Sequence, residues 1–486
     1  MSRLKAFFAA VLAILFSLTL TSHVAFADNP AAEDHYKKGS ALYDKGNYKD
    51  AIIEFNAAIE LDGTQAHYYN DRGWANNYAK NYTDAEKDFN KALELRKDYT
   101  YSYCGRGYAR FFSNKEDAAI EDLEKAIALD ENYKIAHETL AMAYVSKNKS
   151  QEAAEHFAKA GSISLNNKNY KSAVADYNLA IHSDDSNAEY YFNRGVAYAN
   201  WENHNEDAIN DFLKAGNLFL DAQKYSEAQS SFGEVIDLID KTEDKDSNDK
   251  KKIKAEACSG RAKVYQALGD NINAKNHFNY ANVLFDDIGN YDDAIENVTS
   301  ALLISNEPLF HVNRGITYKK TGDFDKAIAD FSEAIDLDKG YMFAYQLRGD
   351  TYFESPRPNY SEALKDFEKV LELNKTSTKP LNEEELNNYH QKIERCKAAI
   401  DPNFIDLIKN SIENLDELMM FLLGVIAFNY IVELLKDRSN LTFTDAIKKL
   451  IGKGILIFVV VLAGALESKF QISPPSRYNY RFSFAL

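Results

Sequence analysis

One run of acidic and amide side chains has the spacing of a calcium-binding loop. Asp244, Asp246 and Asn248 stand at positions 1, 3 and 5 of such a loop. Calcium binding of this kind also needs a glycine at position 6 for the turn and a glutamate at position 12. The sequence has Asp249 and Ala255 at those two places. We therefore expect a solvent-exposed linker here and no metal site.

Histidines and cysteines are the other residues that could bind a metal or transfer protons. The histidines of the central region stand singly, and Cys104, Cys258 and Cys396 are far apart. The sequence has no His-Glu-x-x-His, no Cys-x-x-Cys pair, no phosphate-binding glycine loop and no Gly-x-Ser-x-Gly motif. We therefore predict a protein that is not an enzyme, that needs no cofactor or metal, and that has no evident small-molecule substrate.

The charge and composition exclude one further class of function. The chain has 57 Lys and Arg against 74 Asp and Glu, a formal net charge of −17. Nucleic-acid binding is not expected, because it needs clustered cations that displace counterions from phosphates. Apolar residues are 45% of the sequence, while only 8 prolines and 21 glycines occur. This composition favours a large helical fold.

A repeat along the chain supplies the elements that could position binding residues. A small residue is followed by alanine twelve positions later and by an aromatic or large apolar residue after sixteen, and the pattern recurs with a period of 34 residues. Such a period is typical of stacked helical hairpins. The signature residues are Gly39, Ala51, Phe55, Gly73, Ala85, Phe89, Gly107, Ala119, Gly195, Gly315, Ala327, Phe331 and Gly349.

The spacing of the signature has a mechanical explanation. Ala51, Phe55 and Ala58 stand at i, i+4 and i+7, so all three project from one face of a helix. Alanine allows the two helices of a hairpin to approach closely. The glycine of the first helix leaves room at the crossing, and the aromatic ring fills the remaining space. We therefore predict antiparallel helical hairpins that share one elongated apolar core.

The first helices carry a recognisable motif. It reads Asn-Arg-Gly or Asn-Asp-Arg-Gly, and the chain therefore resembles the tetratricopeptide-repeat family over about residues 32–373. The resemblance implies an all-α solenoid whose groove, lined by first helices, binds a protein or peptide. The copies are Asn70-Asp71-Arg72-Gly73-Trp74, Asn193-Arg194-Gly195-Val196-Ala197-Tyr198 and Asn313-Arg314-Gly315-Ile316-Thr317-Tyr318.

Aligning the repeats places five aromatic residues and two asparagines at or near groove-facing positions. Aromatic side chains there would anchor a peptide, and the amides would fix its backbone. The alternative is that the same residues pack between hairpins. Some members of the family clamp a C-terminal carboxylate with lysines and asparagines, but the equivalent places here hold mainly tyrosine, tryptophan, serine and cysteine. The groove candidates are Tyr36, Asn70, Trp74, Tyr108, Phe111, Phe192 and Asn193.

The repeats are regular at both ends and irregular in the middle. We expect three regular hairpins over 32–133, further regular hairpins over 305–373 and a capping helix over 381–399. Between them, over 134–304, single helices carry both the second-helix and the first-helix signature, which predicts three-helix units and a switch of sides at each shared helix. These units are expected at 134–182, 188–238 and 253–304, with a charged loop over 240–252.

Both ends of the chain carry segments of another kind. Residues 1–27 have the basic start, short apolar stretch and Ala-x-Ala ending of a secretory signal peptide. Residues 418–435 and 450–466 are apolar runs near the lower length limit for a membrane span, and the alternative is a pair of buried amphipathic helices. Basic residues between the two runs place that linker in the cytoplasm. The tail, 471–486, ends in alternating aromatic residues.

Together these patterns predict an exported scaffold or adaptor in the bacterial periplasm or cell envelope, anchored in the inner membrane. The partner is expected to be a protein or peptide held in the groove on the extracytoplasmic side. The alternative is a structural subunit of a secretion or transport complex of the cell envelope. In that case, the helices over 418–435 and 450–466 would assemble with other subunits through their polar residues.

Overall fold

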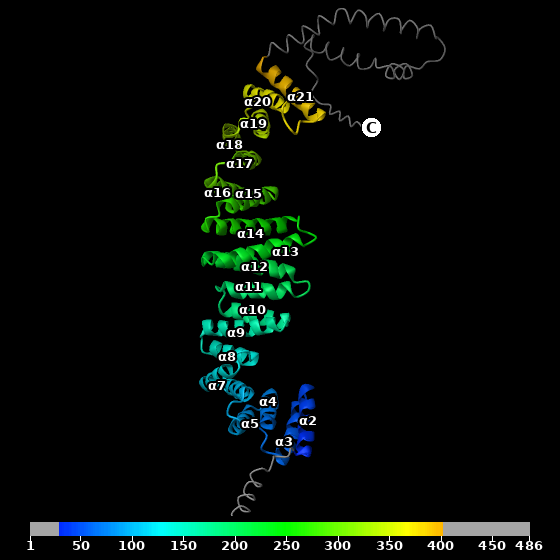
Figure 1. Cartoon of the computed structure of the whole chain (residues 1–486), viewed down its shortest axis with the longest axis vertical. Helices are drawn as coiled ribbons and strands as arrows, with labels where there is room; N and C mark the ends of the chain where they lie inside the picture. The colour runs from blue at the N-terminus through cyan, green and yellow to red at the C-terminus, as the bar shows by residue number, and fades with distance from the viewer. Residues whose placement is uncertain (1–28, 402–486) are drawn as a thin grey trace, which may run out of the picture. The chain divides into compact units, whose positions relative to one another are not determined.

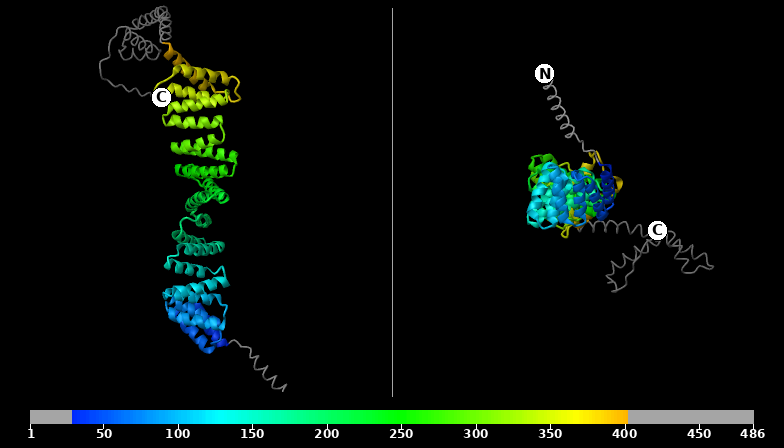
Figure 2. Two further views of the ribbon diagram at one scale, coloured as in Figure 1. Left: turned by 90° about the vertical axis from the view of Figure 1, so that its left-hand side faces the viewer. Right: turned by 90° about the horizontal axis from the view of Figure 1, so that it is seen from below.

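The computed structural model describes residues 29–401 of the 486-residue chain. These residues form twenty α-helices and no strand. The chain divides into two units, one ending at Leu381 and one beginning at Asn382. In the first unit, each helix packs against the next along the chain, so that successive helices lie side by side (Figures 1 and 2). The predicted all-α solenoid of antiparallel hairpins is confirmed for this part of the chain.

Three regular hairpins begin the first unit. Each pairs a first helix with a second helix of similar length. They are α2 (Pro30–Asp44) with α3 (Tyr48–Leu61), α4 (Ala66–Tyr78) with α5 (Tyr82–Leu95), and α6 (Thr100–Phe112) with α7 (Glu116–Leu129).

The middle of the unit contains three groups of three helices, and the central helix of each group is 17 residues long. The groups are α8 (Lys134–Ser146), α9 (Ser150–Asn166) and α10 (Tyr170–Ser183); α11 (Ala188–Ala199), α12 (Asn205–Asp221) and α13 (Tyr225–Asp240); and α14 (Asn248–Ala267), α15 (Asn271–Asp287) and α16 (Tyr291–Ile304).

Two regular hairpins follow, and the described part of the second unit contains one helix. The hairpins are α17 (Pro308–Lys320) with α18 (Phe324–Leu337), and α19 (Met342–Glu354) with α20 (Tyr360–Asn374). The second unit begins with α21 (Glu383–Ile400). Asn382 caps this helix by accepting from the Glu385 amide, while the Glu385 side chain accepts from the Asn382 amide.

The repeat signature forms the core of each hairpin. Ala51, Ala85 and Ala327 are completely buried. A Cβ atom added to Gly73 would lie 2.8 Å from the ring of Phe89, so no larger residue fits at that helix crossing. The same holds at the other signature glycines, each of which faces the aromatic or leucine sixteen to eighteen residues later. The signature residues therefore form the packing contacts between the two helices of a hairpin, as their spacing predicted.

Most turns inside the hairpins share one backbone feature. The second residue after the first helix takes a positive φ, which is +78° at Gly46 and +84° at Gly322. Elsewhere the same left-handed position is filled by residues such as Asn114 or Lys80. Glycine adopts this conformation without strain and asparagine does so at small cost, so these turns end one helix and reverse the chain.

The arginine of the first-helix motif joins three helices. Arg194 of α11 donates to both carboxylate oxygens of Asp211 in α12, at 2.7 Å each, and to Asn178 Oδ1 of α10 at 2.6 Å. The aspartate directly precedes the signature aromatic residue. Five such pairs occur among the described residues: Arg72 with Asp88, Arg106 with Asp122, Arg194 with Asp211, Arg314 with Asp330, and Arg348 with Asp366.

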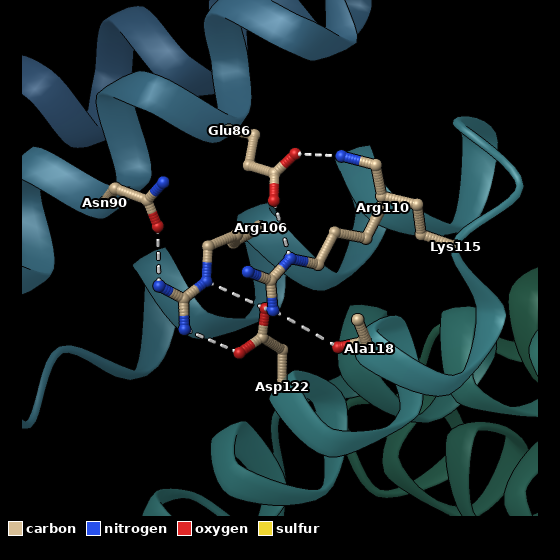
Figure 3. Close-up of polar contacts among 7 residues, drawn as sticks. All are labelled: Glu86, Asn90, Arg106, Arg110, Lys115, Ala118 and Asp122. Carbon is tan, nitrogen blue, oxygen red and sulfur yellow. Dashed lines mark hydrogen bonds and ion pairs between the residues drawn. The ribbon is translucent and has the colours of Figure 1, made fainter.

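The pair in the third hairpin is extended into a network. Arg106 and Arg110 both point at Asp122, and Arg110 also donates to Glu86 at 2.9 Å (Figure 3). Lys115 reaches the other oxygen of Glu86 at 2.7 Å. Because Glu86 lies on α5 and Asp122 on α7, this network holds neighbouring hairpins in register.

The first helices also contact one another along the unit. α2, α4, α6 and α8 form one continuous row, in which each contacts the next first helix. Further along, the contacts of this kind run from α9 to α11, from α12 to α14, and from α15 through α17 to α19. In each three-helix group the central helix therefore packs as a second helix on one side and as a first helix on the other.

The charged loop is shorter than the sequence suggested. We expected it over 240–252, but α14 already begins at Asn248, because Ser247 accepts from the Lys250 amide and caps the helix. Lysines in its first turns then pair with Glu206 and Asp240. Among residues 29–401, no group of three or more His, Cys, Asp or Glu is arranged to hold a metal ion.

Some of the expected segments lie outside the described residues. They are the signal peptide at 1–27, the apolar runs at 418–435 and 450–466, and the tail at 471–486. Of the helices between residues 29 and 401, none is both long and apolar enough to span a bilayer.

Candidate functional site

A cavity of about 340 Å³ opens on the row of first helices at the N-terminal end of the first unit. Its walls come from α2, α4, and the starts of α6 and α8. Seven of its eleven lining residues are tyrosine or tryptophan. The lining residues are Tyr36, Tyr43, His67, Asn70, Asp71, Trp74, Tyr78, Tyr99, Tyr101, Tyr133 and Ile135.

The aromatic rings of the cavity support one another. Tyr36 stands edge-on to His67 with ring centres 4.8 Å apart, and Tyr101 stands edge-on to Tyr133 at 5.2 Å. Trp74 packs against Phe89 of the hairpin core at 5.9 Å. Edge-to-face arrangements of this kind stabilise aromatic clusters by about 0.5–1.5 kcal/mol per pair beyond simple burial. The rings are thus held by the core while their outer surfaces remain open to the cavity.

Asp71 supplies the formal negative charge of the cavity. Its carboxylate accepts from the Tyr36 hydroxyl at 2.7 Å and from Asn70 Nδ2 at 2.8 Å. Asn70 is itself held by the buried Ser102 hydroxyl, which donates to Asn70 Oδ1 at 2.8 Å. The carboxylate is therefore fixed by side chains of α2, α4 and α6.

The charge of Asp71 extends across the cavity. Burial, followed by the Asp71 charge, raises the pKa of Tyr36 above its ordinary value. The same two causes, in the same order, raise the pKa of Tyr99 to about 12. Burial also raises the pKa of Tyr133. Tyr36, Tyr99 and Tyr133 consequently remain neutral hydrogen-bonding groups at physiological pH.

Asp71 differs from the buried aspartates of the hairpins. Asp88, for example, is clamped by Arg72, with Nη2 and Nε both donating to its carboxylate. Asp71 stands immediately before Arg72 in the sequence, yet no Lys, Arg or His of the described residues forms an ion pair with it. No Lys or Arg is among the described residues that line the cavity. The site thus combines a carboxylate that lacks a cationic partner with an aromatic wall.

Three of the seven groove candidates lie together in this cavity. Tyr36 is half-buried, while Asn70 and Trp74 are largely buried but still line the cavity. Tyr108 and Phe111 are half-buried and pack against the apolar core of the second and third hairpins.

The two remaining candidates lie farther along the chain. Phe192 packs on Phe212 and Phe219 of α12, with ring centres 5.4 and 6.4 Å away. Asn193 is half-buried on α11. The cavity therefore does not bring these two residues together with Tyr36, Asn70 and Trp74.

Sequence reasoning missed several lining residues. Tyr99 and Tyr133 are separated by one repeat period and stand at the N-cap positions, directly before α6 and α8. A periodic search that included the turns between hairpins would have found both. A periodic search would not have found Asp71. It belongs to the Asn-Asp-Arg-Gly motif, and the neighbouring residues of that motif are explained by helix packing.

A second cavity, of about 350 Å³, lies between α12, α14, α15 and α16. Its lining combines Glu256, Asp293 and Glu296 with Lys263 and several amides. Burial raises the pKa of Glu256. Because this cavity has mixed charge and only one aromatic residue, Phe285, it offers fewer anchors for a peptide than the N-terminal cavity.

Comparison with known protein families identifies the repeats. Models of the tetratricopeptide repeat match residues 36–100, 100–133 and 308–341. The first two matches cover α4, α6 and most of α2, which build much of the N-terminal cavity, and they end just before α8.

The similarity to curated proteins covers only part of this chain. Human DnaJ homolog subfamily C member 7 is 30% identical over 131 residues, which are 26% of this chain and 26% of that protein. This chain therefore spans about a quarter of the length of that curated relative. The mouse form is 29% identical over the same length.

Two solved structures illustrate the structural similarity. The first tetratricopeptide domain of Spaghetti (RPAP3), bound to an HSP90 peptide, is 28% identical, with 25% of this chain and 98% of that chain covered and a TM-score of 0.24. The tetratricopeptide domain of P58(IPK) is 19% identical and covers 76% of this chain and 98% of its own, with a TM-score of 0.23.

Proposed function

We propose that this chain, in which tetratricopeptide-repeat models match residues 36–100, 100–133 and 308–341, is a non-enzymatic scaffold that holds a segment of a partner protein against its N-terminal first helices. The cavity formed by α2, α4, α6 and α8 carries this proposal. Its volume lies within the range of about 300–1,000 Å³ that is typical of ligand sites. Its aromatic lining provides large contact area at low conformational cost.

The continuous row of first helices supports an extended ligand. Because α2, α4, α6 and α8 contact one another in order, side chains one repeat apart lie next to each other. Tyr36 and Asn70 are related in this way, as are Tyr99 and Tyr133. A peptide that crosses the row would meet an aromatic or amide side chain from each hairpin in turn.

Site-specific photo-crosslinking tests the proposal in the source organism. A photoreactive amino acid at Tyr101, which is 50% exposed in the cavity, is expected to capture a partner. The same residue at Ile53, which is 63% exposed but outside the lining residues, serves as the matched control. Equal capture from both positions, or capture from Ile53 alone, would show that the partner uses another surface.

The sequence supports a location for this scaffold outside the cytoplasm. We propose that residues 1–27 direct export and that 418–435 and 450–466 anchor the protein in the inner membrane of a bacterial cell. The evidence consists of the apolar runs and the distribution of basic residues around them. Protease added to spheroplasts is expected to digest residues 29–401 in the anchored protein. Protection of this region in intact spheroplasts would contradict the assignment.

The alternative is a structural subunit of a secretion or transport complex. It rests on Asn429, Glu433 and Lys453, polar residues within the two apolar runs. Polar side chains in a membrane segment usually contact other segments. Crosslinking followed by detergent extraction separates the two proposals. A single stable membrane complex that persists when Tyr101 is replaced by alanine favours the alternative, whereas loss of the partner favours the scaffold.

A further inference from the structure

The walls of the N-terminal cavity have the electronic character of a cation site. Tyrosine and tryptophan rings carry partial negative charge on their faces and attract ammonium and guanidinium groups. The chain already uses this interaction: the guanidinium of Arg96 lies 4.6 Å from the centre of the Tyr99 ring. Arg96 does not line the cavity, and it lies within 3.7 Å of Asp98. For the six other tyrosines and tryptophans of the lining, no Lys or Arg within residues 29–401 lies over the ring in this way.

The carboxylate of Asp71 completes the site. Each of its oxygens accepts one hydrogen bond, from Tyr36 or from Asn70, and each retains a free lone pair. The five aspartates of the hairpin pairs have arginine partners, but Asp71 has no cationic partner among the described residues. A cation entering the cavity would therefore meet an oriented carboxylate at no cost of breaking an existing ion pair.

We propose that the cavity binds a basic side chain, arginine or lysine, of the partner peptide, with its charge placed between the tyrosine faces and the Asp71 carboxylate. This inference rests on the proposed function. It assigns a chemical class to the partner, namely a segment with at least one exposed basic residue. Arginine fits best, because its planar group can stack on a ring and donate to a carboxylate at the same time.

The same geometry disfavours an acidic peptide. A carboxylate brought into the cavity would face Asp71 and the negative faces of the rings, with no lysine or arginine among the described lining residues to receive it. The net charge of −17 adds a long-range field that attracts basic segments and repels acidic ones. Partner selection would then begin before contact is made.

Peptide selection against the purified full-length chain tests the inference. A random dodecapeptide library is selected on the wild type, and the recovered peptides are measured again with Tyr101→Ala, Asp71→Asn and Asp336→Asn. The first variant removes an exposed ring of the cavity. The second removes the charge of Asp71 but keeps an oxygen that accepts from Tyr36. The third makes the same charge change on the exposed Asp336 of α18, outside the lining residues.

The expected peptides contain arginine or lysine. Replacing that residue with citrulline, which keeps the shape of arginine without its charge, is expected to weaken binding about 10- to 100-fold. Asp71→Asn is expected to weaken the basic peptide about 10-fold and to leave the citrulline peptide unchanged. Asp336→Asn is expected to change neither.

The other outcomes separate this inference from the proposed function. Peptides that depend on Tyr101 but carry no basic residue, or that tolerate citrulline, would overturn the cation site and leave the scaffold intact. Basic peptides that lose the same affinity in Asp336→Asn as in Asp71→Asn would show a general charge effect and also overturn it. If no recovered peptide depends on Tyr101, both the groove and the cation site are wrong.

Discussion

Replacing Arg194 with methionine removes the group that joins α10, α11 and α12. Methionine retains much of the apolar stem of the side chain, so the change mainly deletes the guanidinium. Three hydrogen bonds are lost, two to Asp211 and one to Asn178. Asp211 is then buried without any described cationic partner. The predicted result is a local weakening of the contact between these helices.

The magnitude follows from the burial of the aspartate. The Asp211 side chain is only 8% exposed. Breaking a buried ion pair by removing one partner costs about 3–5 kcal/mol, because the remaining charge is left uncompensated. Arg106→Met provides a graded comparison, because Asp122 would still receive Arg110 Nη1 at 2.8 Å. We expect that variant to lose about 1.5–3 kcal/mol, the contribution of hydrogen bonds to a charged group.

Hydrogen exchange of backbone amides is the suitable assay. A repeat array can open locally, so a single global unfolding energy does not describe it. Exchange followed by peptide mass spectrometry reports the opening free energy of each helix separately. Lys339→Met is the control, because Lys339 and Asp336 form a pair with both side chains more than two-thirds exposed. Such surface pairs contribute about 0–1 kcal/mol.

The deficit of Arg194→Met should also depend on pH. Burial, only partly offset by Arg194, already raises the pKa of Asp211 above 3.8, and loss of the arginine raises it further. Above the unfolded pKa and below the folded pKa, the folded state binds more protons than the unfolded state, so stability falls as pH rises through this range. The deficit is therefore expected to be largest at neutral pH and to shrink toward pH 4.

Two results would refute this reasoning. The first is an equal deficit, within about 0.5 kcal/mol, in Arg194→Met, Arg106→Met and Lys339→Met, since the structure assigns them different burial and different remaining partners. The second is a deficit in Arg194→Met that grows toward acid pH. Either would mean that the arginine contributes packing and not charge compensation.

Gly73→Ala should destabilise α4 and α5 by about 1–3 kcal/mol, because the added methyl group overpacks against the Phe89 ring. Gly233→Ala should stabilise α13 by about 0.5–1 kcal/mol, because nothing lies within 4 Å of the added methyl group. Opening free energies from hydrogen exchange that change in the same direction in both variants would contradict this. Burial acts to raise the pKa of Asp330, but Arg314 and His311 outweigh it, so the pKa is lowered from 3.8. The helices α17 and α18 should therefore lose stability as pH falls below about 3.8, and Asp330→Asn should abolish that loss; hydrogen exchange of these helices at pH 7 and pH 3 measures it. Burial raises the pKa of Cys104, so iodoacetamide should label it only after urea opens α6; rapid labelling of the native chain would show that the helix is not closed.

The fold could be predicted from the sequence because the contacts that define each hairpin join residues close together in the chain. The contact face of the first hairpin is marked by Gly39, Ala51 and Phe55, whose spacings are shorter than one repeat. The equivalent residues recur in the other hairpins and make the same contacts there. The doubled signature on α9, α12 and α15 likewise indicated helices that face two neighbours. The start of α14 was misplaced because its charged first turn resembles a loop until Ser247 is seen to cap it.

The sequence by itself determined that helical hairpins stack with glycine, alanine and aromatic residues at their crossings, because helical periodicity reports directly which face of a helix is buried. Only the tertiary structure decided which side chains converge on one cavity. Tyr36, Asp71 and Tyr99 come from three different helices, and their meeting depends on how one hairpin is rotated against the next. The sequence also left open that no described arginine pairs with Asp71, since Arg72 is its neighbour in sequence but turns away to clamp Asp88.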